Sequence, residues 1–261
     1  FRKAHRGLDP FGVMLYTLLP HAVELGCHTQ GTYVTQKLLK FSNGQELVDA
    51  CRGLYCDPAF FSLLGDDKGK FVVLRSLEAL EGVAEQTTWA RAASQAADAL
   101  CGRFLANQGK MHFATGNHFG EQTLKRAINL GVPHYDAVRL GSRLASQAQA
   151  LVKKGVCGYE LLVDLLTHRT DGSPLEWAGE HHRDIACTIA LQLLDQLPAL
   201  LMDECERGPA VVEALIDRLT DEQEVSWVEN IVSSLIEKGD LLVARPVARR
   251  ILLKALASHF L

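Results

Sequence analysis

The hydrophobic positions of this chain recur in six short segments that share one pattern. Each segment opens with a small residue, and apolar side chains follow at fixed offsets, most often three, seven and eight residues later. The six opening residues are Gly31, Gly69, Gly120, Gly158, Gly208 and Ala248. Because these offsets fall on one side of an α-helix, each segment is predicted to be a helix with one buried face.

A second helical stretch is predicted before each of these segments, with breakers such as Asn43-Gly44 and Gly131-Val132-Pro133 at the joints. These stretches cover residues 11–25, 45–64 with a break near Asp57-Pro58, 90–108, 135–153, 182–202 and 225–238. The opening residues are 38, 51, 38, 50 and 40 positions apart, a spacing typical of stacked helical repeats. We therefore predict an all-α solenoid of about six repeats, forming a single repeat domain over residues 1–261. Whether further repeats lie beyond the ends is left open.

The composition agrees with a well-cored helical protein and argues against several other classes. Hydrophobic residues make up 48% of the 261 positions, enough for a continuous repeat core. No stretch approaches the roughly 18 apolar residues of a membrane helix, so no membrane association is predicted. The seven cysteines are scattered without a CxxC pair, which predicts neither a disulfide framework nor a metal site. No cofactor is expected.

Enzyme motifs are absent or incomplete in the sequence. Residues 65–70, GDDKGK, resemble a phosphate-binding loop but have three residues between the glycines rather than four. They are followed by Phe71, where serine or threonine would hold magnesium. No GxSxG, HExxH or dinucleotide-binding fingerprint occurs. The chain is therefore predicted not to be an enzyme.

One part of the chain resembles a known family of repeat proteins. Residues 31–39, GTYVTQKLL, are similar to the RNA-contacting helix of a Pumilio-type (PUF) repeat, and residues 41–48 and 60–73 resemble the passage into the next repeat. The resemblance covers about residues 11–80 well, continues more weakly through Gly120 and Gly158, and beyond them rests on the apolar pattern alone. It implies a right-handed α-solenoid that binds single-stranded or structured RNA on the concave face of its N-terminal repeats.

In that family, each repeat presents two residues that contact a base edge and a third, between them, that stacks on the base. In the first repeat, the resemblance implies that Thr32 and Gln36 contact the edge and that Tyr33 stacks. An aromatic ring of this kind contributes about 1–3 kcal/mol per base. In the second repeat, the resemblance implies that Phe71 stacks on a base and that Lys70 contacts a phosphate.

The remaining repeats depart from this pattern. Leu74 in the second repeat cannot bond to a base edge, and the fourth and fifth repeats offer little to RNA. The other candidate RNA-binding residues are Glu121, Gln122 and Lys125 in the third repeat and Arg249 and Arg250 in the sixth. These departures resemble the divergent, nucleolar or ribosome-biogenesis branch of PUF-like proteins more than the regulators of messenger RNA. The expected partners are RNA and the other proteins of a ribonucleoprotein complex.

Charge limits where RNA can bind. The net charge is -4, so any RNA site must be local. The acidic runs at residues 203–206 and 221–224 lie near the fifth repeat, which favours RNA binding on the N-terminal repeats. Tyr33 and Phe71 also have a second interpretation, as rings partly buried between repeats. The chain would then be a HEAT- or armadillo-like protein scaffold without RNA. The expected location is intracellular, in the nucleus, nucleolus or cytoplasm, with an organelle left open.

Overall fold

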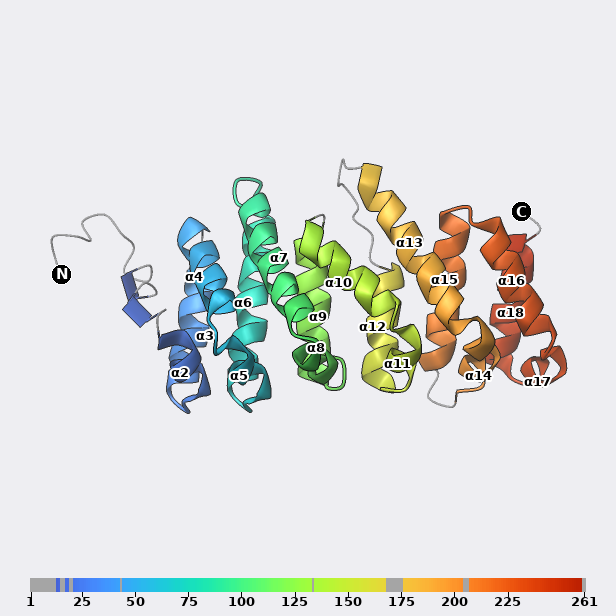
Figure 1. The fold of residues 1–261 in the computed structure, drawn as a ribbon, viewed down its shortest axis with the longest axis horizontal. Coiled ribbons are helices and arrows are strands. Elements are labelled where there is room, and N and C mark those ends of the chain that lie inside the picture. The colour runs from blue at the N-terminus through green and yellow to red at the C-terminus, as the bar shows by residue number, and fades with distance from the viewer. Residues whose placement is uncertain are drawn as a thin grey trace. The chain divides into compact units, whose positions relative to one another are not determined.

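The computed structural model is helical, with no β-strand among the residues that it describes (Figure 1). Those residues are 13–14, 17–18, 21–42, 44–132, 134–167, 176–203 and 207–259. The predicted stretch 11–25 therefore lies partly outside them, while the predicted all-α class is confirmed. The chain divides into two compact bodies, residues 1–140 and residues 141–261. A single repeat domain over the whole chain stays a prediction.

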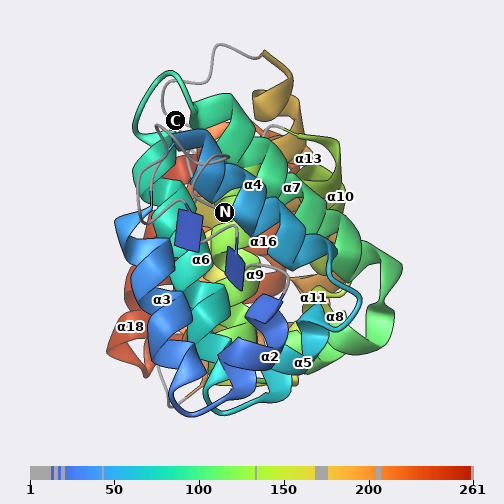
Figure 2. The same ribbon diagram turned by 90° about the vertical axis from the view of Figure 1, so that its left-hand side faces the viewer.

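The N-terminal body contains the first three repeats. Its described helices are α2 (Ala22–Cys27) and α3 (Gly31–Phe41); α4 (Gly44–Cys56), α5 (Phe60–Gly65) and α6 (Gly69–Ala84); and α7 (Ala90–Ala106), α8 (Gln108–Ala114) and α9 (His118–Gly131). Helix α6 packs against both α3 and α9, and α7 packs against α4 and α9. Figure 2 shows α3 and α6 on one side of this body and α4 and α7 on the other. The second helices of neighbouring repeats thus lie side by side.

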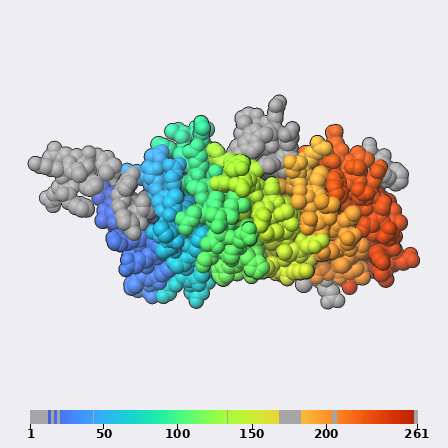
Figure 3. Space-filling model, viewed as in Figure 1, coloured from blue at the N-terminus to red at the C-terminus, as the bar shows by residue number. Residues whose placement is uncertain are grey.

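The C-terminal body repeats this arrangement. Helix α10 (Tyr135–Ala145) spans the boundary between the two bodies. After it come α11 (Ala148–Val152) and α12 (Val156–Thr167); α13 (Glu176–Leu193), α14 (Leu197–Leu201) and α15 (Arg207–Asp221); and α16 (Val225–Ile236), α17 (Gly239–Val243) and α18 (Pro246–His259). Helix α15 packs against both α12 and α18. In the space-filling view, side chains fill the spaces between the ribbons of each body (Figure 3).

From the second repeat onward, each repeat has three helices where the sequence pattern predicts two. The break at Asp57-Pro58 separates α5 from α4, as predicted. The extra helices are short. Two of them, α11 and α14, lie within the last turns of stretches that the pattern predicts as one helix, and the other two, α8 and α17, begin where such a stretch ends. They contain only five to seven residues. A helix of that length is too short for its apolar periodicity to be told from that of the helix before it.

The glycine that opens a repeated helix is required by close contact with the short helix before it. A Cβ atom on Gly69 would lie 2.8 Å from the Cα of Leu63, a distance that real Cβ atoms essentially never show. The same crowding, by the backbone of the preceding short helix, occurs at Gly31, Gly120, Gly158 and Gly208. The recurring glycine therefore marks a place where two backbone segments touch. The sixth repeat has Ala248 there, fully buried.

A polar side chain three residues before the glycine caps several of these helices. The Oδ1 atom of Asp66 accepts a hydrogen bond from the backbone N–H of Gly69 at 2.8 Å, and Asn117 accepts one from Gly120 at the same distance. His28 plays this part in the first repeat through its Nδ1 atom, at 3.3 Å. These bonds satisfy first-turn N–H groups that have no partner within the helix. Hydrogen bonds from the backbone also lower the pKa of Asp66.

One segment of the C-terminal body is apolar enough to cross a membrane by length and composition alone. It covers Arg183–Leu201, with a mean hydropathy of 1.3, although the sequence pattern predicts no such segment. A 3-10 turn at Leu194–Gln196 interrupts it between α13 and α14. In the structure 44% of its most apolar stretch is buried, and α13 packs against α11 and α15. Part of this apolar composition therefore lies in the repeat core.

Candidate nucleic-acid interface

Two exposed aromatic rings lie on neighbouring helices of the N-terminal body. Tyr33 on α3 is 65% exposed and Phe71 on α6 is 44% exposed. Both lie two residues after the glycine that opens their helix, so they occupy equivalent places on helices that pack side by side. A ring exposed in this way offers a surface on which a base can stack. Of the two rings, Tyr33 is mostly exposed, whereas Phe71 is partly buried, so the interpretation of partly buried rings stays open for Phe71.

The two predicted edge-reading residues of the first repeat are bonded to each other. Thr32 is only 3% exposed, and its hydroxyl donates to the backbone oxygen of Lys68 at 3.3 Å. The side-chain amide of Gln36 donates to the same hydroxyl oxygen at 3.1 Å. This bond orients the half-buried Gln36, whose amide oxygen and second N–H remain for other partners. Thr32 therefore lies where it positions Gln36 and links α3 to the start of α6.

The second repeat carries a cluster of two rings and a cation. Phe71 packs edge-to-face against Phe119 of α9, with ring centroids 5.2 Å apart. The ammonium of Lys70 lies 4.5 Å from the centroid of Phe119 and 3.1 Å from a carboxylate oxygen of Asp67. Phe119 was missed from the sequence because it precedes the opening glycine of its repeat, whereas the pattern is counted from that glycine onward. Its packing fixes the ring of Phe71 in place.

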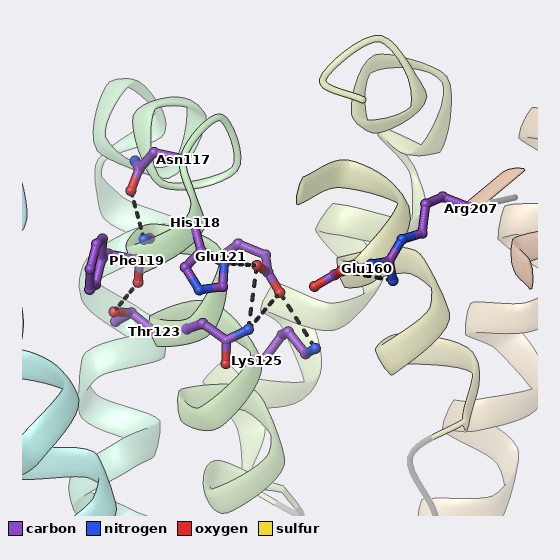
Figure 4. A network of polar contacts seen from close by, with 10 residues as sticks. Asn117, His118, Phe119, Glu121, Thr123, Lys125, Glu160 and Arg207 are labelled. Atoms are coloured by element: carbon purple, nitrogen blue, oxygen red, sulfur yellow. Dashed lines mark hydrogen bonds and ion pairs between the residues drawn. The ribbon is translucent and has the colours of Figure 1, made fainter. Parts of the chain in front are cut away.

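The predicted contacts of the third repeat form a network around a buried carboxylate (Figure 4). Glu121 is fully buried, with one oxygen 3.4 Å from the ammonium of Lys125 and the other 3.4 Å from Nδ1 of His118. The amide of Gln122 donates to Glu121 at 3.3 Å. A buried carboxylate needs such cations and donors to offset its lost hydration. Glu121 thus holds Lys125 in place and presents no exposed surface to a ligand.

Some cations of the N-terminal body are neutralised by acids of the same body. Arg126 of α9 bonds to Glu81 of α6 at 2.6 Å and lies 3.7 Å from Glu78, so this arginine links the two helices. Arg75 pairs with Glu78 at 2.5 Å within α6. Desolvation raises the pKa of Glu81, and the charge of Arg126 opposes that shift.

Two lysines of α3 differ from these arginines. The ammonium groups of Lys37 and Lys40 each lie 5.8 Å from the ring centroid of Phe41. Both lysines are exposed, and neither forms an ion pair with a residue that the structure describes. Their charge is therefore available to phosphate, because no neighbouring carboxylate neutralises it.

The C-terminal body pairs acids and cations between consecutive helices. Glu160 of α12 bonds to Arg207 at the start of α15, at 2.9 Å (Figure 4). Glu213 of α15 bonds to Arg250 of α18 at 2.8 Å, and Lys254 lies 3.4 Å from the same carboxylate. Arg250, a predicted RNA contact, thus already forms an ion pair with Glu213. The predicted contact Arg249 is exposed.

Three of the described cysteines have thiols that burial makes harder to ionise. Burial raises the pKa of the Cys51, Cys101 and Cys27 thiols, which keeps them protonated at neutral pH. Within the described residues, no group of three or more His, Cys, Asp or Glu side chains is placed to hold a metal ion. The chemistry that this part of the chain offers is stacking, hydrogen bonding and charge.

No protein-family model and no curated protein matches this sequence. Solved structures match its fold. The Puf3 RNA-binding domain bound to a Cox17 RNA 3′ UTR site has a TM-score of 0.61 at 15% identity, over 91% of this chain and 57% of that domain. PUF-8 in complex with PBE-RNA has a TM-score of 0.53 at 12% identity, over 96% of this chain and 75% of that one. The RNA-binding domain of yeast Puf5p bound to AAT2 RNA has a TM-score of 0.52 at 11% identity, over 95% of this chain and 74% of that one.

These matches establish the fold and confirm the predicted resemblance at that level. The chain folds as an all-α solenoid of PUF-type repeats. It spans less than two thirds of the length of the Puf3 domain. At such low identities the likeness does not extend to individual contacts. The ten predicted site residues therefore stay predictions.

Proposed function

Because this chain has the fold of PUF-repeat domains, we propose that its N-terminal body binds single-stranded RNA along α3, α6 and α9. The observation that carries the proposal is the pair of exposed rings, Tyr33 and Phe71, at equivalent places on adjacent helices. Single-stranded nucleic acids are bound by such rings together with nearby cations. The Puf3, PUF-8 and Puf5p structures that share this fold are themselves bound to RNA, which supports the same class of ligand here.

In this proposal each side chain has a defined part. Tyr33 and Phe71 stack on bases, and Gln36, oriented by Thr32, contacts a base edge. Lys70 lies beside the aromatic cluster, where it meets a phosphate by replacing its bond to Asp67. The proposed role of all these side chains is binding.

The proposed binding depends little on base sequence. Gln36 carries the amide placed for a base edge in the first repeat, and Leu74 offers none in the second. Stacking tolerates every base, since each has a π-face. Gln122, Lys125, Arg249 and Arg250 remain proposed contacts, and Glu121 a proposed support for Lys125. The repeats therefore lack the side chains that would be needed to recognise one base each across all six.

We propose further that RNA binding takes place within a ribonucleoprotein, as in ribosome biogenesis, in the nucleus, nucleolus or cytoplasm. The C-terminal body favours protein partners over phosphate, because Glu160 and Glu213 neutralise the cations Arg207, Arg250 and Lys254. The same observation favours the alternative function, a protein-binding scaffold, for that body. The two functions are compatible, since they use different helices.

The experiment is a titration of a pool of single-stranded RNA against the purified chain at two salt concentrations. The double variant Tyr33→Ala plus Gln36→Ala is expected to lose about 1–3 kcal/mol of binding free energy. Tyr135→Ala is the matched control, since Tyr135 is 70% exposed but lies on α10, away from the proposed face. Folded wild-type protein that binds no RNA would exclude the proposal and leave the scaffold function.

A further inference from the structure

A groove of about 260 Å³ lies between the end of α3 and the later turns of α6, in the N-terminal body. The residues that line it include Lys40, Ser42, Arg75, Glu78 and Gly82. Lys40 lies about two helical turns after Tyr33, and Glu78 about two turns after Phe71, so the groove is on the face that carries the two exposed rings. The separation along each helix is about 10 Å. None of the ten predicted RNA contacts lines this groove.

Gly82 lies within α6 without any packing that requires a glycine. Nothing lies within 4 Å of a Cβ atom placed on it, in contrast to Gly69 at the start of the same helix. Its φ is not among the positive values either, so the backbone conformation does not require a glycine. A glycine inside a helix lowers stability relative to alanine. One role that offsets this cost is to let a ligand approach the backbone closely, and Gly82 leaves one side of the groove open.

The hydroxyl of Ser42 is buried without a partner. The residue is 7% exposed, and its Oγ atom has no hydrogen bond among the described residues. A buried hydroxyl in this state costs free energy that a hydrogen bond from a ligand would recover. Ser42 lines the groove, so a polar group bound there is placed to supply that bond.

Arg75 and Glu78 place donors and acceptors side by side in the groove. The Nη1 atom of Arg75 lies 2.5 Å from a carboxylate oxygen of Glu78, and their side chains are 39% and 35% exposed. A guanidinium has five N–H donors and a carboxylate accepts several bonds, so both groups retain capacity for a ligand. Guanine has matching atoms, because O6 and N7 accept paired bonds from arginine and the adjacent N1–H and N2–H₂ groups donate. Adenine has an N–H₂ group where guanine has O6.

We propose that this groove binds a guanine base of the RNA, next to the bases that stack on the two exposed rings. The proposal rests on the proposed RNA binding and adds to it a preference at one nucleotide. Arg75 donates to O6 and N7 of the guanine, and Glu78 accepts from its N1–H and N2–H₂ groups. The base lies over the backbone at Gly82, and the exposed Lys40 meets the phosphate of the same nucleotide. A helix of a partner protein is disfavoured, since a helix with its side chains is about 10 Å wide and the groove is small.

The experiment compares short uridine strands that carry one guanine, one adenine or no purine, with the purine moved through every position. Wild type is expected to bind its best guanine strand about tenfold more tightly than the matching adenine and uridine strands. Gly82→Leu fills the open side of the groove, and Arg75→Lys keeps the charge but loses the paired donors. Both variants should bind the guanine strand only as tightly as the uridine strand.

Two further variants sharpen the comparison. Arg52→Leu is the matched control for Gly82→Leu, because Arg52 is exposed on α4, on the other side of this body (Figure 2), and it should keep the guanine preference. Ser42→Ala should weaken binding of the guanine strand several-fold without lowering the melting temperature, since its hydroxyl has no partner to lose among the described residues. Circular dichroism verifies that each variant is folded.

Three results overturn the proposal, and they separate its failure from that of the RNA-binding function. Equal affinity of wild type for guanine and adenine strands removes the guanine site and leaves RNA binding in place. A guanine preference that survives in both Gly82→Leu and Arg75→Lys places the base elsewhere on the chain. Folded wild-type protein that binds none of the strands excludes the RNA-binding function, and the guanine site with it.

Discussion

Two helical glycines of the N-terminal body differ in their surroundings, and substitution by alanine distinguishes them. The backbone of Ala114 crowds Gly120, whereas nothing lies within 4 Å of a Cβ atom on Gly82. Gly120→Ala is expected to lower the free energy of unfolding by about 1–3 kcal/mol, because the added methyl group forces two backbone segments apart. Gly82→Ala should raise it by about 0.5–1 kcal/mol, since alanine favours the helix. Denaturant titration measures both, and a stabilised Gly120→Ala protein would contradict the crowding.

Asp66 makes the stability of α6 depend on pH. Its pKa in the folded chain lies below the ordinary value of 3.8, because the N–H groups of Gly69 and Lys68 donate to the charged carboxylate. This stabilisation is present above the unfolded pKa and is lost as the pH falls through the folded pKa. Asp66→Asn keeps an acceptor oxygen but does not titrate. Its melting temperature should therefore fall less than that of wild type between about pH 5 and about pH 2.

The neighbouring substitution Asp67→Asn is the control. Asp67 is exposed and, among the described residues, accepts a bond from the side chain of Lys70 but none from a backbone N–H of the first turn of α6. Melting curves recorded by circular dichroism across this pH range give the comparison. Identical acid dependence in wild type and Asp66→Asn would show that the cap contributes nothing to it.

Sequence position predicted the exposure of some side chains and not of others. Tyr33 and Phe71, two residues after their glycines, point away from the buried stripe and are exposed, as a helical pattern requires. Thr32 and Glu121 lie one residue after their glycines and are buried, although Lys70 at the same offset is partly exposed. Their burial depends on hydrogen bonds and ion pairs with nearby side chains and the next repeat. Such contacts have no periodicity in the sequence.

At the scale of helices, the boundaries that carry a strong breaker were the predictable ones. The end of α4 is marked by Asp57-Pro58, and α5 follows it as expected. The boundary between α7 and α8 has no proline or glycine; Asn107 starts the new helix by accepting a hydrogen bond from the backbone N–H of Lys110. An asparagine alone is a weak signal, because the residue also occurs within helices. The short helices therefore merged with their predecessors in the sequence pattern.

The link between α3 and α6 is testable through Thr32. Thr32→Val keeps the shape of the side chain but removes the hydroxyl that bonds to Gln36 and to the backbone oxygen of Lys68. The free energy of unfolding should fall by about 0.5–1.5 kcal/mol, because two partners lose a hydrogen bond. Discrimination at the base that Gln36 contacts should weaken, since the amide is no longer oriented.

Binding of a panel of RNAs that differ at one base measures this discrimination. Thr32→Ser retains the hydroxyl and should keep the preference of wild type. A Thr32→Val protein with unchanged preference would show that Gln36 either needs no support or contacts no base.

At the scale of the whole chain, the net charge of -4 conceals two different charge distributions. The N-terminal body carries Lys37 and Lys40, beside the exposed ring of Phe41, without ion-pair partners among the described residues. In the C-terminal body, an acid of α12 neutralises a cation of α15, and an acid of α15 neutralises a cation of α18. Attraction of a polyanion should therefore be strongest on the first body, as the acidic runs near the fifth repeat also indicate.

The salt dependence of RNA binding tests this distribution. If Lys70 contacts a phosphate, Lys70→Ala should reduce the slope of log affinity against log salt by about 0.7, the value for one contact with a single strand. Lys254→Ala removes a cation that pairs with Glu213 and Asp217, and should leave the slope unchanged. Fluorescence anisotropy at several salt concentrations provides both slopes. A smaller slope in Lys254→Ala would place RNA on the C-terminal body.

The architecture of the chain was more predictable than its interface. Recurring apolar offsets predicted six helical repeats, because every repeat buries the same apolar face against its neighbour. The division into two bodies was not predictable, since it reflects how contacts are distributed in space and has no marker near Leu140. Nor does repetition reveal Phe119, whose contact with Phe71 is particular to one pair of repeats.

The crowded glycines also determine where the chain tolerates added length. Around Gly69 and Gly120 the backbone of one helix touches that of another, so an inserted residue there would separate the packed helices. The turn at residues 85–89, between α6 and α7, is largely exposed and lies in the longer spacer between repeats. Exposed loop tips are where domain insertion succeeds. A fluorescent protein or affinity tag placed in that turn should therefore leave the proposed RNA face intact, which makes it a practical site for labelling.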